Sequence, residues 1–264
     1  MHQNVCSASG NYRRRGWADL AYHESYSECS TKFTRAMDIK SNGTMFVETK
    51  VRGTSVKRTR KFKSADRTRD TLLAAAEHVF ARFGYDGATV ERISKQAKCF
   101  ESLIYYHFGN KERLFVAVLQ ENYRRLIEAE QALELDIADP SGALRQIVNF
   151  YWTYYQKHPE LITLLNTENM QRGKHLAKAS SMSELLRPAL SILEEVLNAG
   201  VSRKIFRRDL DSVDVYLAIM SSAYFYMSNR YTLSAFLSRD LMSSEQREHW
   251  GAQIEELVVR FVQA

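Results

Sequence analysis

The spacing of the apolar residues is the feature that most restricts the fold of this chain. From about residue 67 onward, apolar residues recur at every third or fourth position, which is the period of an amphipathic helix, and no stretch keeps the alternation of a β-strand. Only 3 prolines and 11 glycines interrupt the 264 residues, which also favours helix. A chain of this length can bury one large core or two modest ones. The sequence therefore predicts an all-α fold.

The predicted helices begin near Ser64, which can cap the first of them. Thr89 caps a short second helix, and Asn110 caps a long fourth helix that opens at Lys111. Residues 140–142, Pro-Ser-Gly, are expected to break the helical pattern. The first and third helices are expected at residues 67–83 and 101–108, and the later ones at residues 143–157, 159–170, 182–199, 212–230 and 244–262.

The N-terminal segment, residues 1–64, differs from the rest of the chain. It is rich in Ser, Thr, Asn, Arg and Tyr, and its apolar residues show no sustained period, which predicts a mostly disordered extension. Met37 and Met45 lie inside this segment, so it stays open whether residues 1–44 are translated in the working protein.

Positive charge is concentrated in residues 50–69. The whole chain carries a formal net charge of +6, which suits nucleic acid or another anionic surface without choosing between them. Within residues 50–69 the only acid is Asp66. The basic residues of this run are Lys50, Arg52, Lys57, Arg58, Arg60, Lys61, Lys63, Arg67 and Arg69. Two interpretations remain open, a solvated charge run and an arm that binds an anionic partner.

Three features of the sequence exclude other classes of protein. Cys6, Cys29 and Cys99 are far apart and form no CxxC pair, so neither a metal site nor a disulfide framework is expected, and free thiols suit a reducing cytoplasm. No run of 18 apolar residues is present, so no membrane span is expected. The N-terminus lacks the apolar core of a signal peptide. We predict neither a metal nor another cofactor.

Three short helices in about 45 residues, next to a basic arm, predict a helix-turn-helix DNA-binding unit at residues 89–108. Its third helix is short enough to enter the major groove. Ser102, Tyr105 and Tyr106 on this helix can donate hydrogen bonds to phosphates or base edges, and His107 and Lys111 lie at its end, where cations meet the DNA backbone.

The residues of this unit also form recognisable strings. They include Phe80-Ala81-Arg82-Phe83-Gly84-Tyr85, Ala88-Thr89-Val90, Ile93-Ser94, Ile104-Tyr105-Tyr106-His107-Phe108 and Asn110-Lys111-Glu112. Residues 71–115 closely resemble the N-terminal domain of the TetR family of repressors. The resemblance implies a homodimer that binds a near-palindromic operator in double-stranded DNA. It also implies two domains, residues 65–112 for DNA binding and residues 113–264 for effector binding and dimerisation.

The resemblance implies roles for individual residues. Thr89 would cap the positioning helix, Tyr105 would face the DNA, and Lys111 would bind a phosphate. Tyr106 and Phe108 are expected to pack, although Tyr106 could also reach a phosphate. The full set of predicted DNA-binding residues is Thr89, Phe100, Glu101, Ser102, Tyr105, Tyr106, His107 and Lys111.

The turn between the second and third helices departs from the family pattern. The usual Gly-hydrophobe-Ser turn appears here as Lys98-Cys99-Phe100, and the small Gly-Thr pair appears as Ser102-Leu103. A serine cap is therefore missing at Phe100. Either the turn is held differently, or Phe100 contacts a base methyl group or a neighbouring helix.

The C-terminal part has a fainter likeness to regulators of pyrimidine and nicotinate-type heterocycle catabolism. The residues that carry it are Asn166-Thr167-Glu168-Asn169-Met170, Gly173-Lys174-His175-Leu176 and Tyr224-Phe225-Tyr226-Met227-Ser228-Asn229-Arg230. The aromatic residues 150–155 are either core or the lining of a ligand cavity. We predict a small aromatic or nitrogen-heterocyclic effector, bound by Trp152, Tyr155, Asn169 and Tyr224.

The last two predicted helices carry apolar residues such as Met220 and Leu257. In the family these helices usually form an intersubunit four-helix bundle, whereas packing within one chain is the alternative. The function predicted from all these features is an effector-released transcriptional repressor. The alternatives are an effector-independent regulator or activator, a helical enzyme, and a structural scaffold. No phosphate-binding loop, HExxH motif or convincing carboxylate pair supports the enzyme.

Overall fold

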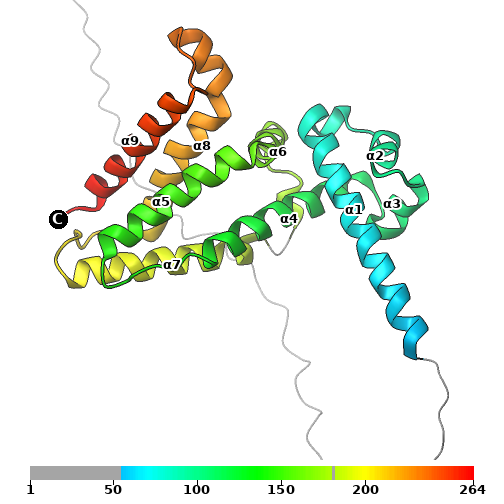
Figure 1. Ribbon diagram of the computed structural model, residues 1–264, viewed down its shortest axis with the longest axis horizontal. Coiled ribbons are helices and arrows are strands. Elements are labelled where there is room, and N and C mark those ends of the chain that lie inside the picture. The colour runs from blue at the N-terminus through cyan, green and yellow to red at the C-terminus, as the bar shows by residue number, and fades with distance from the viewer. Residues whose placement is uncertain (1–54, 180–181) are drawn as a thin grey trace, which may run out of the picture. The chain divides into compact units, whose positions relative to one another are not determined.

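The computed structural model describes residues 55–179 and 182–264, and within these ranges the chain is helical with no β-strand (Figure 1). The predicted all-α fold is therefore confirmed. The α-helices are α1 (Ser55–Gly87), α2 (Val90–Ala97), α3 (Glu101–Phe108), α4 (Lys111–Gln131), α5 (Pro140–Lys157), α6 (Pro159–Met170), α7 (Met182–Ser202), α8 (Ser212–Leu237) and α9 (Ser244–Val262). A short 3₁₀ turn, Leu176–Lys178, follows α6.

The caps predicted for α2 and α4 are present. The Thr89 side chain accepts a hydrogen bond from the Arg92 N–H at 3.1 Å, and the Asn110 Oδ1 accepts one from the Arg113 N–H at 2.8 Å. At the start of α9, the Ser243 hydroxyl accepts from the Gln246 N–H at 3.3 Å. These local bonds satisfy N–H groups of the first helical turn that would otherwise have no partner.

Several predicted boundaries are wrong. Helix α1 begins at Ser55, so Ser64 lies inside the helix and does not cap it. Pro140 does not break the pattern but is the first residue of α5, where its missing N–H costs nothing, and Asp139 caps that helix. Helix α8 continues to Leu237 instead of ending at residue 230. The segment predicted to be disordered was residues 1–64; residues 55–64 are instead part of α1, and residues 1–54 lie outside the described residues.

The apolar residues form two cores. The first lies among α1, α2, α3 and the first half of α4, and its buried members include Leu72, Phe80, Ile104 and Phe115. The second lies among α5, α7, α8 and α9, with Tyr151 and Trp152 inside it. Helix α4 runs from the first group of helices into the second (Figure 1), and so it joins the two cores physically.

Phe83 continues the apolar spacing of Leu72, Ala76 and Phe80 on α1, yet it is 41% exposed. The guanidinium groups of Arg82 and Arg92 lie 5.3 and 4.5 Å from the centre of its ring. Gly84 comes next with φ 68°, a left-handed conformation in which the regular helix ends before the turn to α2. Phe83 therefore lies at the last turn of the regular helix, only partly covered, with one cation of α1 and one of α2 against its ring.

Candidate functional site

Helices α2 and α3 form the helix-turn-helix, and backbone geometry holds the turn between them. Lys98 adopts the left-handed conformation with φ 53°, and the Cys99 N–H donates to the Ser94 carbonyl at 3.0 Å. Phe100 precedes α3 without making a side-chain cap bond and is 82% exposed. Backbone bonds therefore hold the turn, and the exposure of Phe100 excludes its packing on a neighbouring helix. A contact between Phe100 and a base methyl group stays a prediction.

Helix α3 divides into a buried face and an exposed face. Ile104 and Phe108 are buried, whereas Tyr105 is 51% and Tyr106 is 80% exposed. The expectation that Phe108 packs is confirmed, and the expectation that Tyr106 packs is wrong. Glu101 and Ser102 are also exposed, and His107 is half-buried with its ring edge against Tyr106. The exposed face thus combines hydroxyl groups and aromatic rings, which can donate hydrogen bonds to phosphates and touch base edges.

Lys111, the first residue of α4, makes hydrogen bonds within the protein. Its Nζ donates to the carbonyl oxygens of Tyr85 and Ala88, at 3.1 Å each, and lies 4.5 Å from the centre of the Tyr85 ring. Lys111 therefore fastens the start of α4 to the corner between α1 and α2. A contact between Lys111 and a phosphate remains a prediction, and it would have to compete with these bonds.

A second candidate site is a cavity of about 650 Å³ beside α6 and α8. Its lining is mostly apolar and aromatic, with a few polar groups, which is the usual make-up of a small-molecule site. The residues that line it are Tyr123, Tyr155, Leu165, Glu168, Asn169, Leu176, Asp214, Tyr216, Leu217, Ala218, Met220, Ser221, Tyr224 and Phe261.

Three of the four predicted effector residues meet in this cavity. The Tyr224 hydroxyl donates to the Asn166 Oδ1 at 2.5 Å, and the Asn169 Nδ2 lies 3.5 Å from the same hydroxyl. The Tyr155 hydroxyl lies 3.0 Å from the Met220 sulfur, and its ring centre is 6.2 Å from that of Tyr224. Burial raises the pKa of the Tyr155 phenol well above its usual value, so the group is a neutral donor at ordinary pH.

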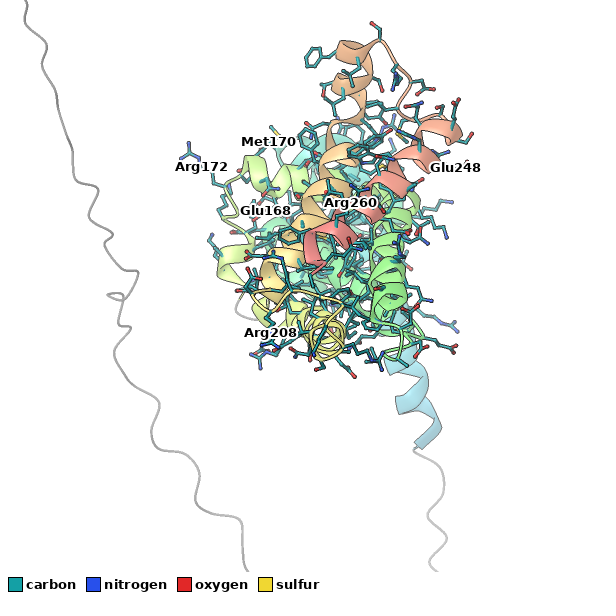
Figure 2. The ribbon with its side chains drawn as sticks, turned by 90° about the vertical axis from the view of Figure 1, so that its left-hand side faces the viewer. Glu168, Met170, Arg172, Arg208, Glu248 and Arg260 are labelled. Atoms are coloured by element: carbon teal, nitrogen blue, oxygen red, sulfur yellow. The ribbon has the colours of Figure 1, made fainter. Side chains whose placement is uncertain are left out.

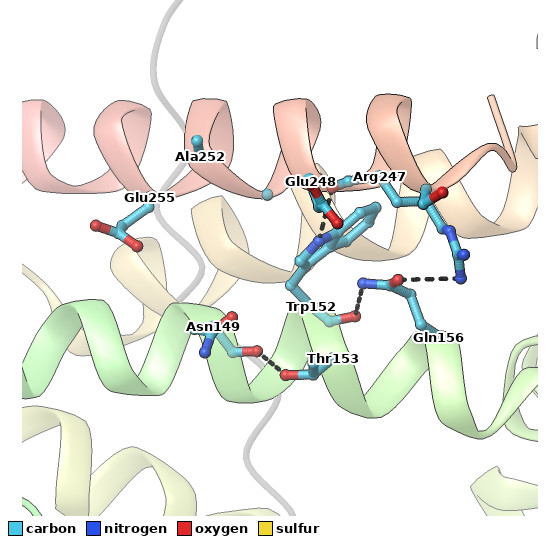
Figure 3. A pocket seen from close by; sticks show the side chains of 10 residues that line it. Asn149, Trp152, Thr153, Gln156, Arg247, Glu248, Ala252 and Glu255 are labelled. Carbon is cyan, nitrogen blue, oxygen red and sulfur yellow. Dashed lines mark hydrogen bonds between the residues drawn. The ribbon is translucent and has the colours of Figure 1, made fainter.

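Trp152 does not line this cavity, contrary to the prediction. It lies in a separate groove of about 430 Å³ between α5 and α9 (Figure 3). Its indole Nε1 donates to the Arg247 carbonyl at 3.2 Å, and its ring centre is 5.3 Å from that of Tyr226. Trp152 is 4% exposed, so it is a core residue whose polar atom has an internal partner.

Other residues of the cavity are not predicted by the sequence. Tyr123 on α4 and Tyr216 on α8 contribute phenol groups to its wall, and burial raises the pKa of Tyr123 to about 12. Met220, expected in an intersubunit contact, lies against Tyr155 inside the cavity. The spacing of these residues matches a buried helix face equally well, so no local signal separates a core position from a cavity wall.

Other kinds of site are not found in the described part of the chain. Among residues 55–179 and 182–264, no group of three or more His, Cys, Asp or Glu side chains is placed to hold a metal ion. None of the helices in these ranges is long and apolar enough to cross a membrane. Burial raises the pKa of the Cys99 thiol, which disfavours the thiolate that a redox switch would need.

A helix-turn-helix with an exposed third helix, followed by a helical domain that holds a cavity, defines a transcriptional regulator of the two-domain type. Residues 72–118 match the family described as bacterial regulatory proteins, tetR family, and residues 140–258 match the family described as tetracyclin repressor-like, C-terminal domain. The chain belongs to the TetR family.

Relatives of known role agree with this assignment. The HTH-type transcriptional repressor NicS of Pseudomonas putida is 43% identical over 198 residues, which are 75% of this chain and 93% of NicS. The HTH-type transcriptional repressor SCO4008 of Streptomyces coelicolor is 32% identical over 111 residues, 42% of this chain and 54% of the relative. The protein is therefore a TetR-type transcriptional regulator and not an enzyme, and regulators of this family bind operator DNA and act as dimers.

Solved structures show the same fold. The putative transcriptional regulator SCO4942 from Streptomyces coelicolor matches with a TM-score of 0.55 and 23% identity. The match covers 72% of this chain and 97% of the SCO4942 chain. The fatty acid degradation regulator FadR from Bacillus halodurans matches with a TM-score of 0.56 and 22% identity. The match covers 72% of this chain and 94% of the FadR chain. At this identity the likeness supports the arrangement of helices and says nothing about the effector.

Proposed function

We propose that this protein is a dimeric repressor that leaves its operator when a small aromatic or nitrogen-heterocyclic molecule occupies the cavity beside α6 and α8. One observation carries the proposal. The same chain presents an exposed polar and aromatic face on α3 and, separately, a cavity of about 650 Å³ lined by tyrosines and a few polar groups. The proposed site of action is the cytoplasm.

The proposed DNA-binding domain is residues 65–112, and α3 is its reading helix. Exposure favours Phe100, Glu101, Ser102, Tyr105 and Tyr106 as the residues that meet DNA. In this proposal His107 and Lys111 lie at the edge of the contact, and Thr89 acts through its cap bond to α2. The basic run at residues 50–69 adds sequence-independent attraction to the phosphates.

The proposed effector domain is residues 113–264, and its ligand is a nicotinate- or pyrimidine-related catabolite. The likeness of residues 166–176 and 224–230 to regulators of such pathways supports this class, as does the lining of the cavity. Tyr155 and Tyr224 offer aromatic faces on which a planar ring can stack, and the Asn169 amide can orient its polar atoms. Trp152 is no longer part of the proposed site.

The proposed mechanism is a population shift. The ligand binds more tightly to an arrangement of the two reading helices that does not fit the operator. Bound ligand therefore lowers the affinity for DNA, and bound DNA lowers the affinity for the ligand by the same factor. To change the ratio of the DNA-competent form to the released form from about 99:1 to 1:99, the ligand must bind the released form more tightly by roughly 5.5 kcal/mol. A smaller difference gives partial release.

The proposed dimer contact is an exposed apolar surface on α8 and α9. On α8 it contains Val213, Leu217 and Phe225, and on α9 it contains Leu257 and Phe261, each at least 38% exposed in the single chain. At about 100° per residue, Val213, Leu217 and Phe225 lie within about 120° of one another, on one side of α8. Exposed apolar surface of this kind marks an interaction site in a folded protein.

The test is release of the protein from an operator selected out of a random DNA library. Nicotinate, hydroxylated nicotinate, uracil, thymine and benzoate are the compounds to screen. Release by at least one of them is expected, and the affinity of that compound should fall in Tyr224→Phe and Asn169→Ala. Asn149→Ala, an exposed asparagine in the α5–α9 groove, is the matched control and should change nothing. Operator binding that no compound changes would instead support an effector-independent regulator.

A further inference from the structure

The connection between α6 and α7 lies against the DNA-binding domain. The Lys178 Nζ is 2.6 Å from the Glu112 Oε1 at the start of α4, and the Gln171 Nε2 donates to the Asp86 Oδ2 at 3.0 Å, just before α2. Leu176 packs on the core formed by α1 to α4 and also lines the cavity. Residues 171–178 are therefore in contact with both the DNA-binding domain and the cavity.

A buried carboxylate fixes this connection to α6. Glu168 is 2% exposed, and its Oε1 accepts hydrogen bonds from the backbone N–H groups of His175 at 2.8 Å and Leu176 at 2.9 Å. Its Oε2 lies 2.7 Å from the His175 Nδ1. A buried carboxylate that loses its partners is strongly destabilising, so these three bonds hold the connection firmly. By contrast, Met170 and Arg172 project outward near the end of α6 (Figure 2).

His175 contacts residues of the DNA-binding domain. Its ring is 1% exposed, and the ring centre lies 4.3 Å from that of Tyr85 and 5.1 Å from that of Phe115. Tyr85 in turn is the residue whose carbonyl and ring face the Lys111 ammonium group. A continuous set of contacts, buried at Glu168 and His175 and partly buried at Tyr85 and Lys111, thus runs from the cavity wall to the first residue of α4, directly after α3.

We propose that the Glu168–His175 pair couples the cavity to the reading helix. A molecule in the cavity displaces Glu168, the three hydrogen bonds move His175 with it, and the imidazole ring shifts Tyr85 and the Lys111 bonds that orient the start of α4. The buried pair carries the coupling because it is rigid and shielded from water, whereas the Lys178–Glu112 ion pair is largely exposed and screened. The inference rests on the proposed function, since it requires operator binding and a cavity that controls it.

The test is a double-mutant cycle in operator affinity that needs no effector. Ala218→Phe places a ring in the cavity as a permanent occupant, because Ala218 lines it from α8. His175→Phe keeps an aromatic ring against Tyr85 and Phe115 but removes the bond to Glu168. Operator dissociation constants are measured for the original protein, both single variants and the double variant, after circular dichroism and sedimentation have confirmed folded dimers.

Ala218→Phe alone should weaken operator binding by roughly tenfold, within the range typical of allosteric coupling. In the His175→Phe background the same change should have less than a threefold effect. Glu168→Gln, which keeps the shape of the side chain, is the second background and should also reduce the effect. Lys178→Ala is the matched control, since it removes only the exposed bond across the same contact, and it should leave the tenfold effect intact.

Equal effects of Ala218→Phe in the original, His175→Phe and Glu168→Gln backgrounds would overturn the coupling role. So would an Ala218→Phe variant with unchanged operator affinity, because a filled cavity would then not reach α3. A tenfold effect that Lys178→Ala abolishes as fully as His175→Phe would place the coupling in the whole contact and not in the buried pair. A folded dimer that selects no operator at all would instead refute the proposed function itself.

Discussion

Glu130, near the C-terminal end of α4, should make the protein less stable as the pH rises. Its side chain is 2% exposed, and within the described residues its Oε2 has no hydrogen-bond partner. Burial raises the pKa of the Glu130 carboxyl from 4.5 to about 7, and the nearby Tyr151 side chain lowers it by a smaller amount. The folded protein therefore favours the protonated form of this group.

The pKa difference sets the size of the effect. A folded pKa of about 7 against an unfolded value of 4.5 corresponds to about 3 kcal/mol of unfolding free energy. Because the folded pKa is the higher one, this stability is fully present below about pH 4.5 and is lost as the pH rises to about 7. Glu130→Gln removes the titrating group. At pH 8 it should raise the unfolding free energy by up to about 3 kcal/mol, equivalent to a rise in Tm of roughly 6–12 °C.

Urea unfolding of the original protein and Glu130→Gln at several pH values between 5 and 8 measures this effect. The difference between the two proteins should be small at pH 5 and grow steadily to pH 8. Glu128→Gln is the control, because Glu128 is on the same helix but is exposed and paired only with Arg124 at the surface. Parallel pH profiles for the original protein and Glu130→Gln would refute the reasoning.

Three further changes probe other parts of the structure. Thr89→Ala removes the cap of α2 and should lower the unfolding free energy by about 1 kcal/mol in a urea titration; an unchanged midpoint would mean that the cap contributes nothing. Lys111→Ala loses its bonds to the Tyr85 and Ala88 carbonyls, so both stability and operator affinity should fall, and a loss of affinity alone would show that its role is confined to DNA. Leu257→Asp puts a charge on the exposed apolar surface and should give folded monomers by sedimentation, whereas a folded dimer would place the interface elsewhere.

The features predicted well from the sequence depend on local interactions. The bounds of α3, residues 101–108, and the caps Thr89 and Asn110 follow from residues within one helical turn of each other. The helical content follows from the apolar spacing in the same way. Local signals of this kind do not depend on which helices pack together, and so a single sequence is enough to identify them.

The predictions that are wrong depend on contacts between elements far apart in the sequence. Trp152 and Tyr155 are three residues apart on α5, yet Trp152 faces α9 and Tyr155 faces the cavity beside α8. The spacing of apolar residues in α5 does not predict which helix packs on each of its sides. Tyr106 follows Tyr105 directly, and only the packing of Ile104 and Phe108 decides that both tyrosines are exposed.

The Glu168–His175 pair shows the same limit. Both residues belong to strings that carry the family likeness, but their hydrogen bonds depend on a turn in which Arg172 and Gly173 have positive φ values. No periodic pattern predicts that a carboxylate and an imidazole seven positions apart will meet in a buried site. The contact of His175 with Tyr85 depends further on how α6 packs on α1.

We propose above all that this chain binds a specific operator through the exposed face of α3. The most direct test is to select binding sites from a random DNA library and to footprint the selected duplex with the original protein and with Tyr105→Ala. We expect protection of a near-palindromic site at nanomolar protein, and at the same concentration no protection by the folded Tyr105→Ala dimer. Equal protection by both proteins, or selection of no sequence by the original protein, would contradict the claim.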